Sequence, residues 1–161
     1  MKLKILLFAL GVSIMAQSCF STKLTDEEIS VKKQQLEKAV QAGIWRIDVD
    51  RCTGFAGKII NLTGTYYLQM QGDSAEMRLP FYGQTNDPLL HAKGGVDVKN
   101  NITSKSIKAT PKGDGWEIKF KIASDFEYYD VKVTIYYDGG ADFYLFPSNR
   151  SDMSYYGTAT F

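Results

Sequence analysis

Two aspartates on one expected strand form the best-placed acid–base pair in the sequence. Asp48 and Asp50 alternate with apolar residues, so they share the polar face of that strand, about 7 Å apart along an extended chain. Paired carboxylates can carry out general acid–base chemistry on a sugar. Alternating acids are also common on a solvated strand face, and neither aspartate is expected to be buried. The sequence therefore predicts no catalytic residue and no enzyme.

The chain has a single histidine, His91, in an expected loop over residues 84–93. A metal site there would need Asp87 and Asp97, the nearest carboxylates, and nothing in the sequence has the spacing of a zinc site. A serine hydrolase would need His91 as its base, but there is no G-x-S-x-G motif. Phosphate-binding glycine loops are also missing. We expect no metal and no cofactor.

Outward-facing aromatic residues favour a binding role instead. Alternation in the C-terminal strands places Tyr136, Tyr144 and Tyr156 on the outer face of a sheet, with Phe146 nearby. Tyrosines in such a stripe can stack on sugars or contact a protein partner. In the alternative interpretation, an N-terminal helix or the tether before it covers them. These three tyrosines are the predicted surface-binding residues.

The N-terminus predicts export. Lys2 and Lys4 precede an apolar run over residues 5–15 and a cleavage region with small residues, as in a secretory signal peptide. The run is shorter than the roughly 20 apolar residues of a permanent membrane anchor. Export places the working protein outside the cytoplasm, in the periplasm or at the outer membrane.

The residues at the end of the leader leave two alternatives for Cys19, lipidation or a free thiol. Residues 16–19 resemble a bacterial lipobox, in which the cysteine is diacylated and becomes the first residue of the mature chain. Ala16 and Ser18 also fit an ordinary signal peptidase, which would leave the thiol free. We favour lipidation at Cys19, because an unpaired exposed thiol is a liability in an oxidising compartment. The lipid would attach the protein to a membrane.

The predicted organisation is a signal peptide over residues 1–18, a tether over 19–24 and a single β-rich domain over 25–161. Removing the leader leaves 143 of the 161 residues, enough for one domain with a substantial core. The leader contains two lysines and no acid, so the net charge falls from +1 to −1. A near-neutral chain gives no electrostatic reason to expect nucleic acid as a partner.

One helix is expected before the strands. Thr25 lies three residues before Glu28, the spacing of a capping box. Leu36 and Val40 recur on one helical face, and Gly43 is a natural C-terminal stop.

From residue 44 onward the apolar period changes to two, which is typical of half-buried strands. A turn at residues 72–73 sets Met70 opposite Ala75 and Leu68 opposite Met77. In the C-terminal half, we expect Tyr137 to lie opposite both Trp116 and Ala141 in neighbouring strands. About nine antiparallel strands follow in sequential order. This pattern predicts a mainly β fold with one N-terminal helix, as an up-and-down barrel or a strongly curved two-layer sheet.

Several blocks of the sequence resemble those of a family of exported Bacteroidetes proteins called domain of unknown function 4251. The resemblance covers roughly residues 36–161. It implies a leader, often that of a lipoprotein, and a mainly β domain with no assigned activity. It transfers no catalytic residue. The blocks are Asn61-Leu62-Thr63-Gly64, Tyr66-Tyr67-Leu68, Gly72-Asp73, Leu79-Pro80-Phe81-Tyr82-Gly83, Gly115-Trp116-Glu117-Ile118, Ser148-Asn149-Arg150 and Ser154-Tyr155-Tyr156-Gly157.

Three functional hypotheses follow. The first is a non-catalytic envelope module that binds a small apolar ligand, a glycan or another envelope protein. The second is a filled structural barrel that acts through its outer surface, and the third is a hydrolase that uses Asp48 and Asp50. The interior distinguishes the first two, because large side chains packed solidly inside would exclude an internal ligand. The side chains expected there are Trp45, Tyr66, Phe81, Trp116 and Phe120.

Overall fold

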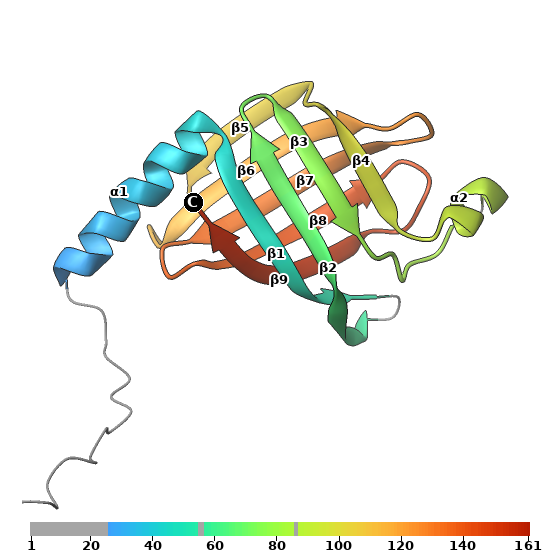
Figure 1. Cartoon of the computed structure of the whole chain (residues 1–161), viewed down its shortest axis with the longest axis horizontal. Helices are drawn as coiled ribbons and strands as arrows, with labels where there is room; N and C mark the ends of the chain where they lie inside the picture. The colour runs from blue at the N-terminus through green and yellow to red at the C-terminus, as the bar shows by residue number, and fades with distance from the viewer. Residues whose placement is uncertain (1–25, 55–56, 86) are drawn as a thin grey trace, which may run out of the picture.

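The computed structural model describes residues 26–54, 57–85 and 87–161; the leader, Cys19, the tether and Thr25 lie outside the described residues. The described chain forms one nine-stranded sheet, with helices at opposite ends of it (Figure 1). The elements are α1 (Asp26–Ala42), β1 (Ile44–Thr53), β2 (Ile59–Gln71), β3 (Ser74–Leu79), α2 (Pro88–Lys93), β4 (Val96–Asn101), β5 (Ser104–Ala109), β6 (Gly115–Ala123), β7 (Tyr128–Tyr136), β8 (Gly140–Pro147) and β9 (Met153–Thr160).

The sheet curls because its two edges are neighbours in the chain. All pairings are antiparallel, in the order β4-β3-β2-β1-β9-β8-β7-β6-β5, so β4 and β5 are the edge strands. The three peptide links between Asn101 and Ser104 span at most about 11 Å, so the two edges must approach each other there. Hydrogen bonds hold this corner: Ile102 N donates to Asp73 O, and Thr103 N donates to Lys121 O. The predicted mainly β fold is confirmed, as a half-barrel.

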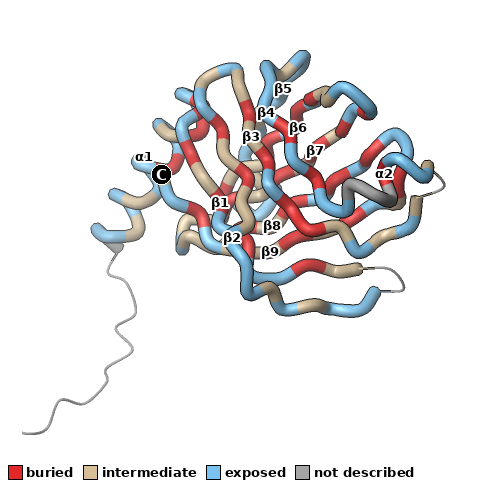
Figure 2. Tube along the Cα trace, turned by 45° about the vertical axis from the view of Figure 1, so that its right-hand side comes forward, coloured by how far each residue is buried: buried red, intermediate tan, exposed pale blue. Residues whose placement is uncertain are grey.

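The concave side of the half-barrel is filled with apolar side chains. Alternate residues are buried along most of the strands, which produces the red and pale segments of Figure 2, whereas the edge strand β5 has no buried residue. Of the large side chains expected inside, Trp45 and Phe120 are buried. Tyr66, Phe81 and Trp116 are half-buried and pack against the same core. Side chains therefore occupy the space in which a barrel would hold an internal ligand.

Helix α1 packs on the core at one end of the sheet, and α2 lies beyond the other end (Figure 1). Leu36 and Val40 of α1 are fully buried in the core, as the helical periodicity predicts. Gly43 ends α1 with φ +67°, and a Cβ there would lie 2.6 Å from Gly72 O, so only glycine fits this close approach. In α2, Leu90 is buried and Leu89 is exposed.

The strand registers are confirmed in one half of the sheet and corrected in the other. Met70 lies opposite Ala75, as predicted. Trp116, however, lies opposite Ile135, and Ile135 lies opposite Ala141, so both C-terminal registers were wrong by two residues. Two turns are responsible. After β7, Asp138 Oδ1 accepts a hydrogen bond from Gly140 N and Tyr137 becomes a turn residue. Between β6 and β7, Ser124 N donates to Glu127 O and closes a tighter turn than the predicted one. An even shift keeps each side chain on its predicted face.

Candidate functional site

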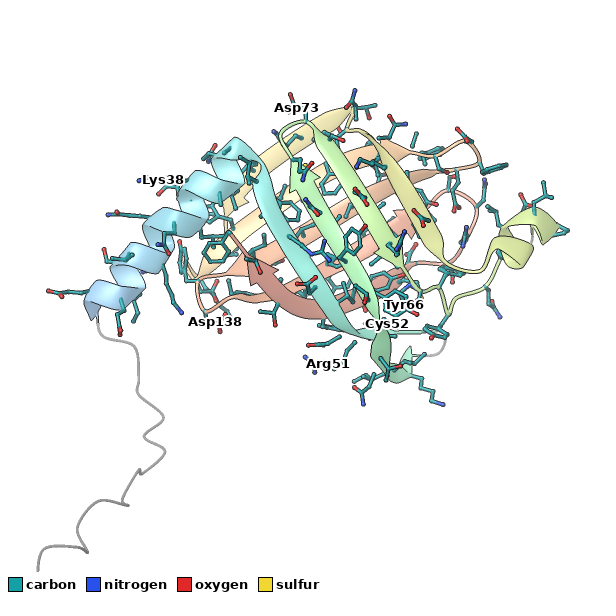
Figure 3. The ribbon with its side chains drawn as sticks, in the orientation of Figure 1. Lys38, Arg51, Cys52, Tyr66, Asp73 and Asp138 are labelled. Carbon is teal, nitrogen blue, oxygen red and sulfur yellow. The ribbon has the colours of Figure 1, made fainter. Side chains whose placement is uncertain are left out.

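The predicted surface tyrosines lie on the outer face of β7–β9, but two of them have other contacts. Tyr136 donates a hydrogen bond to Asp142 Oδ1 (2.9 Å), and this bond, with burial, raises the pKa of Tyr136 to about 12. Tyr136 also lines a small pocket with Ile29 of α1, beside the turn marked by Asp138 in Figure 3. The ring of Tyr156 lies 5.7 Å from the guanidinium carbon of Arg51.

Tyr144 forms an exposed pair with Phe146 on the outer face of β8. The two rings are nearly parallel, with centroids 6.4 Å apart and an interplanar angle of 16°. Tyr144 is 43 % exposed and Phe146 is 39 % exposed. Tyr128, at the start of β7, is also exposed and lies diagonally across from Phe146. Adjacent exposed aromatic rings mark a binding surface more often than single ones do. We call Tyr144 and Phe146 the aromatic shelf.

A groove of about 490 Å³ runs beside the aromatic shelf, across β5, β6 and β7. Four lysines, one aspartate and two serines line it, together with Phe146 and two core residues beneath. We call it the outer groove; its residues are Ser104, Lys105, Ser106, Lys119, Phe120, Lys121, Asp130, Val131, Lys132 and Phe146.

Two rows of directly paired residues build the outer groove. Each row starts with an aromatic side chain of the shelf on β8 and ends with a serine on β5. The first row is Tyr144, Lys132, Lys119 and Ser106, and the second is Phe146, Asp130, Lys121 and Ser104. Each row is about 14 Å long and the rows are about 7 Å apart, from the spacing of strands and of alternate residues.

The lysines of the outer groove form ion pairs that remain open to solvent. Glu117 contacts Lys119 Nζ (3.2 Å) and Lys132 Nζ (2.9 Å), and Asp130 contacts Lys121 Nζ (3.0 Å). The hydrogen bond from Lys132 lowers the pKa of Glu117 and raises that of Lys132. Lys105 pairs with Asp73, labelled in Figure 3 at the β2–β3 turn. The pair of Lys121 with Asp130 is well exposed on both sides and contributes little stability, whereas Glu117 and Lys105 are more deeply placed.

The outer face of β1–β4 has similar residue types in a different arrangement. The guanidinium of Arg46 covers the ring of Tyr67 at 3.9 Å, and the Tyr67 hydroxyl donates to Glu76. Three cations and three acids on this face pair one to one, so its charge is balanced. The pairs are Arg46–Asp48, Arg78–Asp97 and Lys99–Glu76. This face therefore presents neither an uncovered ring nor an excess of one charge.

The two aspartates considered for acid–base chemistry lie on β1, each beside an arginine. Asp48 contacts Arg46 Nε (2.8 Å) and Asp50 contacts Arg51 Nε (3.0 Å), and both carboxylates are well exposed. A β-bulge between Val49 and Arg51 interrupts the strict alternation on which their common face was inferred. Each of the two carboxylates therefore forms an ion pair with a different arginine.

His91 falls in α2, and its side chain lies outside the described residues. Within residues 26–54, 57–85 and 87–161, no three His, Cys, Asp or Glu side chains gather closely enough to hold a metal ion. In the same ranges, no helix has the length and apolarity needed to cross a membrane. Cys52 is a free thiol buried in the core, where it fills space.

Sequence reasoning missed a buried ion pair near the α2 end of the sheet. Arg150 Nε lies 2.8 Å from Glu127 Oε1, and both side chains are almost completely buried. The Tyr129 hydroxyl donates to the same Oε1 (2.6 Å), and burial followed by this bond raises the pKa of Tyr129. Arg150 Nη1 also donates to Gly94 O (2.8 Å). The pair thus joins the loops that precede β4, β7 and β9.

Comparison with known proteins agrees with the fold. A family model described as Domain of unknown function (DUF4251) matches residues 27–159. A crystal structure of a DUF4251 family protein from Bacteroides eggerthii DSM 20697 is 17 % identical, with a TM-score of 0.63 over 80 % of this chain and 87 % of that chain. No curated protein matches the sequence. The resemblance inferred from the sequence blocks is therefore confirmed: the chain belongs to the DUF4251 family.

Proposed function

We propose that this protein is an exported, lipid-anchored binding module that acts through the outer groove and its aromatic shelf, without catalytic chemistry. The observation that carries the proposal is the exposed, stacked pair Tyr144–Phe146 beside a groove lined by four lysines. Contiguous exposed apolar groups mark interaction sites more often than scattered ones do. The two cross-strand rows hold these side chains on rigid strands, which suits recognition of a ligand.

The filled interior supports an outer rather than an inner binding surface. Most inward residues of the strands are buried apolar side chains, and Leu36 and Val40 of α1 pack into the same core. A small apolar ligand would have to displace residues such as Phe143 and Tyr155, whose rings stack 4.9 Å apart. Displacing well-packed core side chains is costly. The outer face offers its side chains without that cost.

The surroundings of the two candidate aspartates support a non-catalytic role. A general acid needs a raised pKa, which commonly comes from burial or from a neighbouring carboxylate. Asp48 and Asp50 are exposed, and each forms an ion pair with an arginine. The hydrolase hypothesis thus has less support than the binding hypothesis.

The leader supports the export and the lipid anchor. The charged head, apolar run and lipobox-like exit precede a described domain that begins only a few residues after Cys19. A single acyl signal gives weak membrane binding, whereas two or more chains hold a protein stably. A diacylated Cys19 would keep the half-barrel close to the membrane surface.

One purification tests both parts of this proposal. The protein is extracted in mild detergent from the membranes of the cells that make it, and native mass spectrometry reports its N-terminus and any retained molecule. We expect a chain that begins at lipid-modified Cys19 and a retained molecule that the Tyr144→Ser/Phe146→Ser variant loses. Tyr67→Ser, on the other outer face, is the matched control and should retain it.

Two results would contradict the proposal separately. A mature chain that starts at an unmodified residue would remove the lipid anchor. Equal retention by the Tyr144→Ser/Phe146→Ser variant and the wild type would remove the outer groove as the binding surface.

A further inference from the structure

We infer that the ligand of the outer groove is an acidic carbohydrate, a chain of sugar rings that carry carboxylate or sulfate groups. This inference rests on the proposed function of the same surface. It combines three features of the two rows: an excess of lysine, parallel exposed rings and terminal serine hydroxyls.

The charge of the rows favours an anion. Three lysines stand against one aspartate within the rows, and two acids, Glu117 and Asp142, lie at the border. The side chains of Lys119, Lys121 and Lys132 are 55 %, 57 % and 41 % exposed. Lys121 can therefore turn from Asp130 to a ligand anion with little loss of stability. The local excess is small, which suits a ligand with a few charges rather than one on every unit.

The aromatic shelf favours a ring-shaped ligand. The faces of Tyr144 and Phe146 are nearly parallel and stand at the end of the lysine rows. An aromatic face attracts the weakly positive C–H groups on one face of a sugar ring, by the quadrupole that also attracts cations. A sugar lying on the shelf would extend its acidic groups along the rows toward Lys132 and Lys121.

The far end of the rows offers hydroxyl groups. Ser104 and Ser106 lie on the edge strand β5 and are exposed, and each hydroxyl can donate and accept a hydrogen bond. Carbohydrate hydroxyls need partners of this kind. With rows about 14 Å long, the surface is long enough for an oligosaccharide rather than a single sugar.

A protein partner and a single-stranded nucleic acid fit the same surface less well. The centres of protein–protein interfaces are depleted of lysine, yet lysines occupy the middle of both rows here. Grooves for single-stranded nucleic acid also join aromatic rings to cations, but they follow a charge on every nucleotide. The near-neutral balance of this protein gives them little support.

Binding titrations with four defined probes test the inference on the full mature protein. The probes are a galacturonate oligomer, a neutral glucose oligomer of equal length, an oligoglutamate peptide and an oligothymidylate. We expect the galacturonate oligomer to bind at least about tenfold more tightly than the other three, and more weakly as salt is added, because exposed charges are screened. Equal binding of the neutral oligomer would overturn the role of charge. Equal binding of the peptide or the oligothymidylate would overturn the choice of a carbohydrate.

Variants of residues in the two rows test whether these residues bind the galacturonate oligomer. Phe146→Ala and Lys119→Gln/Lys132→Gln should each weaken galacturonate binding about tenfold, whereas Tyr67→Ala should leave it unchanged. Phe146→Leu keeps an apolar side chain but removes the aromatic ring, so it should weaken galacturonate binding about as much as Phe146→Ala. Thermal unfolding of each variant shows that it is folded. If the groove variants bind the oligomer as well as Tyr67→Ala does, the inference is wrong.

Failure of the inference and failure of the proposed function give different results. If no carbohydrate binds, but the Tyr144→Ser/Phe146→Ser variant still loses a molecule retained by the wild type, only the inference fails. If that variant loses nothing, the outer groove is not the binding surface and both fail.

Discussion

Replacing Arg150 with methionine is expected to lower the free energy of unfolding by about 3–5 kcal/mol, since it leaves a buried carboxylate without its cation. Glu127 is completely buried, and Arg150 Nε lies 2.8 Å from its Oε1, as an ion pair rather than an aligned hydrogen bond. No hydrogen-bond partner of Glu127 Oε2 is found in the described part of the chain. The buried carboxylate is therefore stabilised through Oε1, by Arg150 and the Tyr129 hydroxyl. Urea unfolding measures the loss.

Arg78→Met is the matched control for this prediction. Arg78 forms the exposed pair with Asp97 (3.5 Å), and removing an exposed partner should change stability little. The double variant Arg150→Met/Glu127→Met should recover much of the loss, because it removes both charges. A loss in Arg150→Met no larger than that in Arg78→Met would show that the buried pair does not stabilise the fold.

The second large effect is expected at Phe143, in the middle of β8. Its side chain is completely buried and stacks on Tyr155, with ring centroids 4.9 Å apart. Phe143→Ala should therefore cost about 3–5 kcal/mol, from lost apolar burial and the cavity left behind. The midpoint of urea unfolding should fall accordingly, with the slope unchanged if only stability is affected.

Tyr144 is the natural control, because it is the next residue and points to the other face. Tyr144→Ala should change the free energy of unfolding by no more than about 1 kcal/mol while weakening ligand binding. Phe143→Ala should show the opposite pattern where it remains folded. If Tyr144→Ala destabilised the protein as much as Phe143→Ala, the faces assigned to β8 would be wrong.

Much of the fold could be predicted because the spacing of apolar residues can be recognised within each short segment of the sequence. The β2–β3 hairpin has a two-residue turn at Gly72 and Asp73, which fixes its register without any knowledge of the rest of the sheet. The turn after β7 left more choices. Asp138 selects one of them by its hydrogen bond to Gly140 N, a side-chain contact that periodicity does not contain. The turn between β6 and β7 was equally open, and the hydrogen bond from Ser124 N to Glu127 O closes it. At both turns the error of two residues preserved the faces and changed the neighbours.

That change of neighbours explains why the outer groove was only partly anticipated. Tyr144 was predicted to face outward, and it is exposed on the outer face of β8; its role in binding stays a prediction. With the predicted register, Lys132 would face Lys121 rather than Lys119, and the two rows would not form. Pairing between strands is long-range, so the row of lysines becomes visible only once the register is known.

The buried Glu127–Arg150 pair had no sequence signal of its own. Arg150 belongs to a block shared with the family, but charged residues in loops are usually exposed. Its partner lies 23 residues away, and both are buried because three loops meet at the same end of the half-barrel. Such convergence depends on the curvature of the whole sheet.

Site-specific photo-crosslinking in the cells that make the protein can show which outer face contacts the ligand. A photoreactive amino acid replaces Tyr144 in one strain and Tyr67 in a second, and the mature protein is recovered after illumination. If the ligand binds the outer groove, we expect a cross-linked envelope component at position 144 and none at position 67. Cross-linking at position 67 with none at position 144 would contradict binding at the outer groove, because the ligand would then bind the outer face of β1–β4.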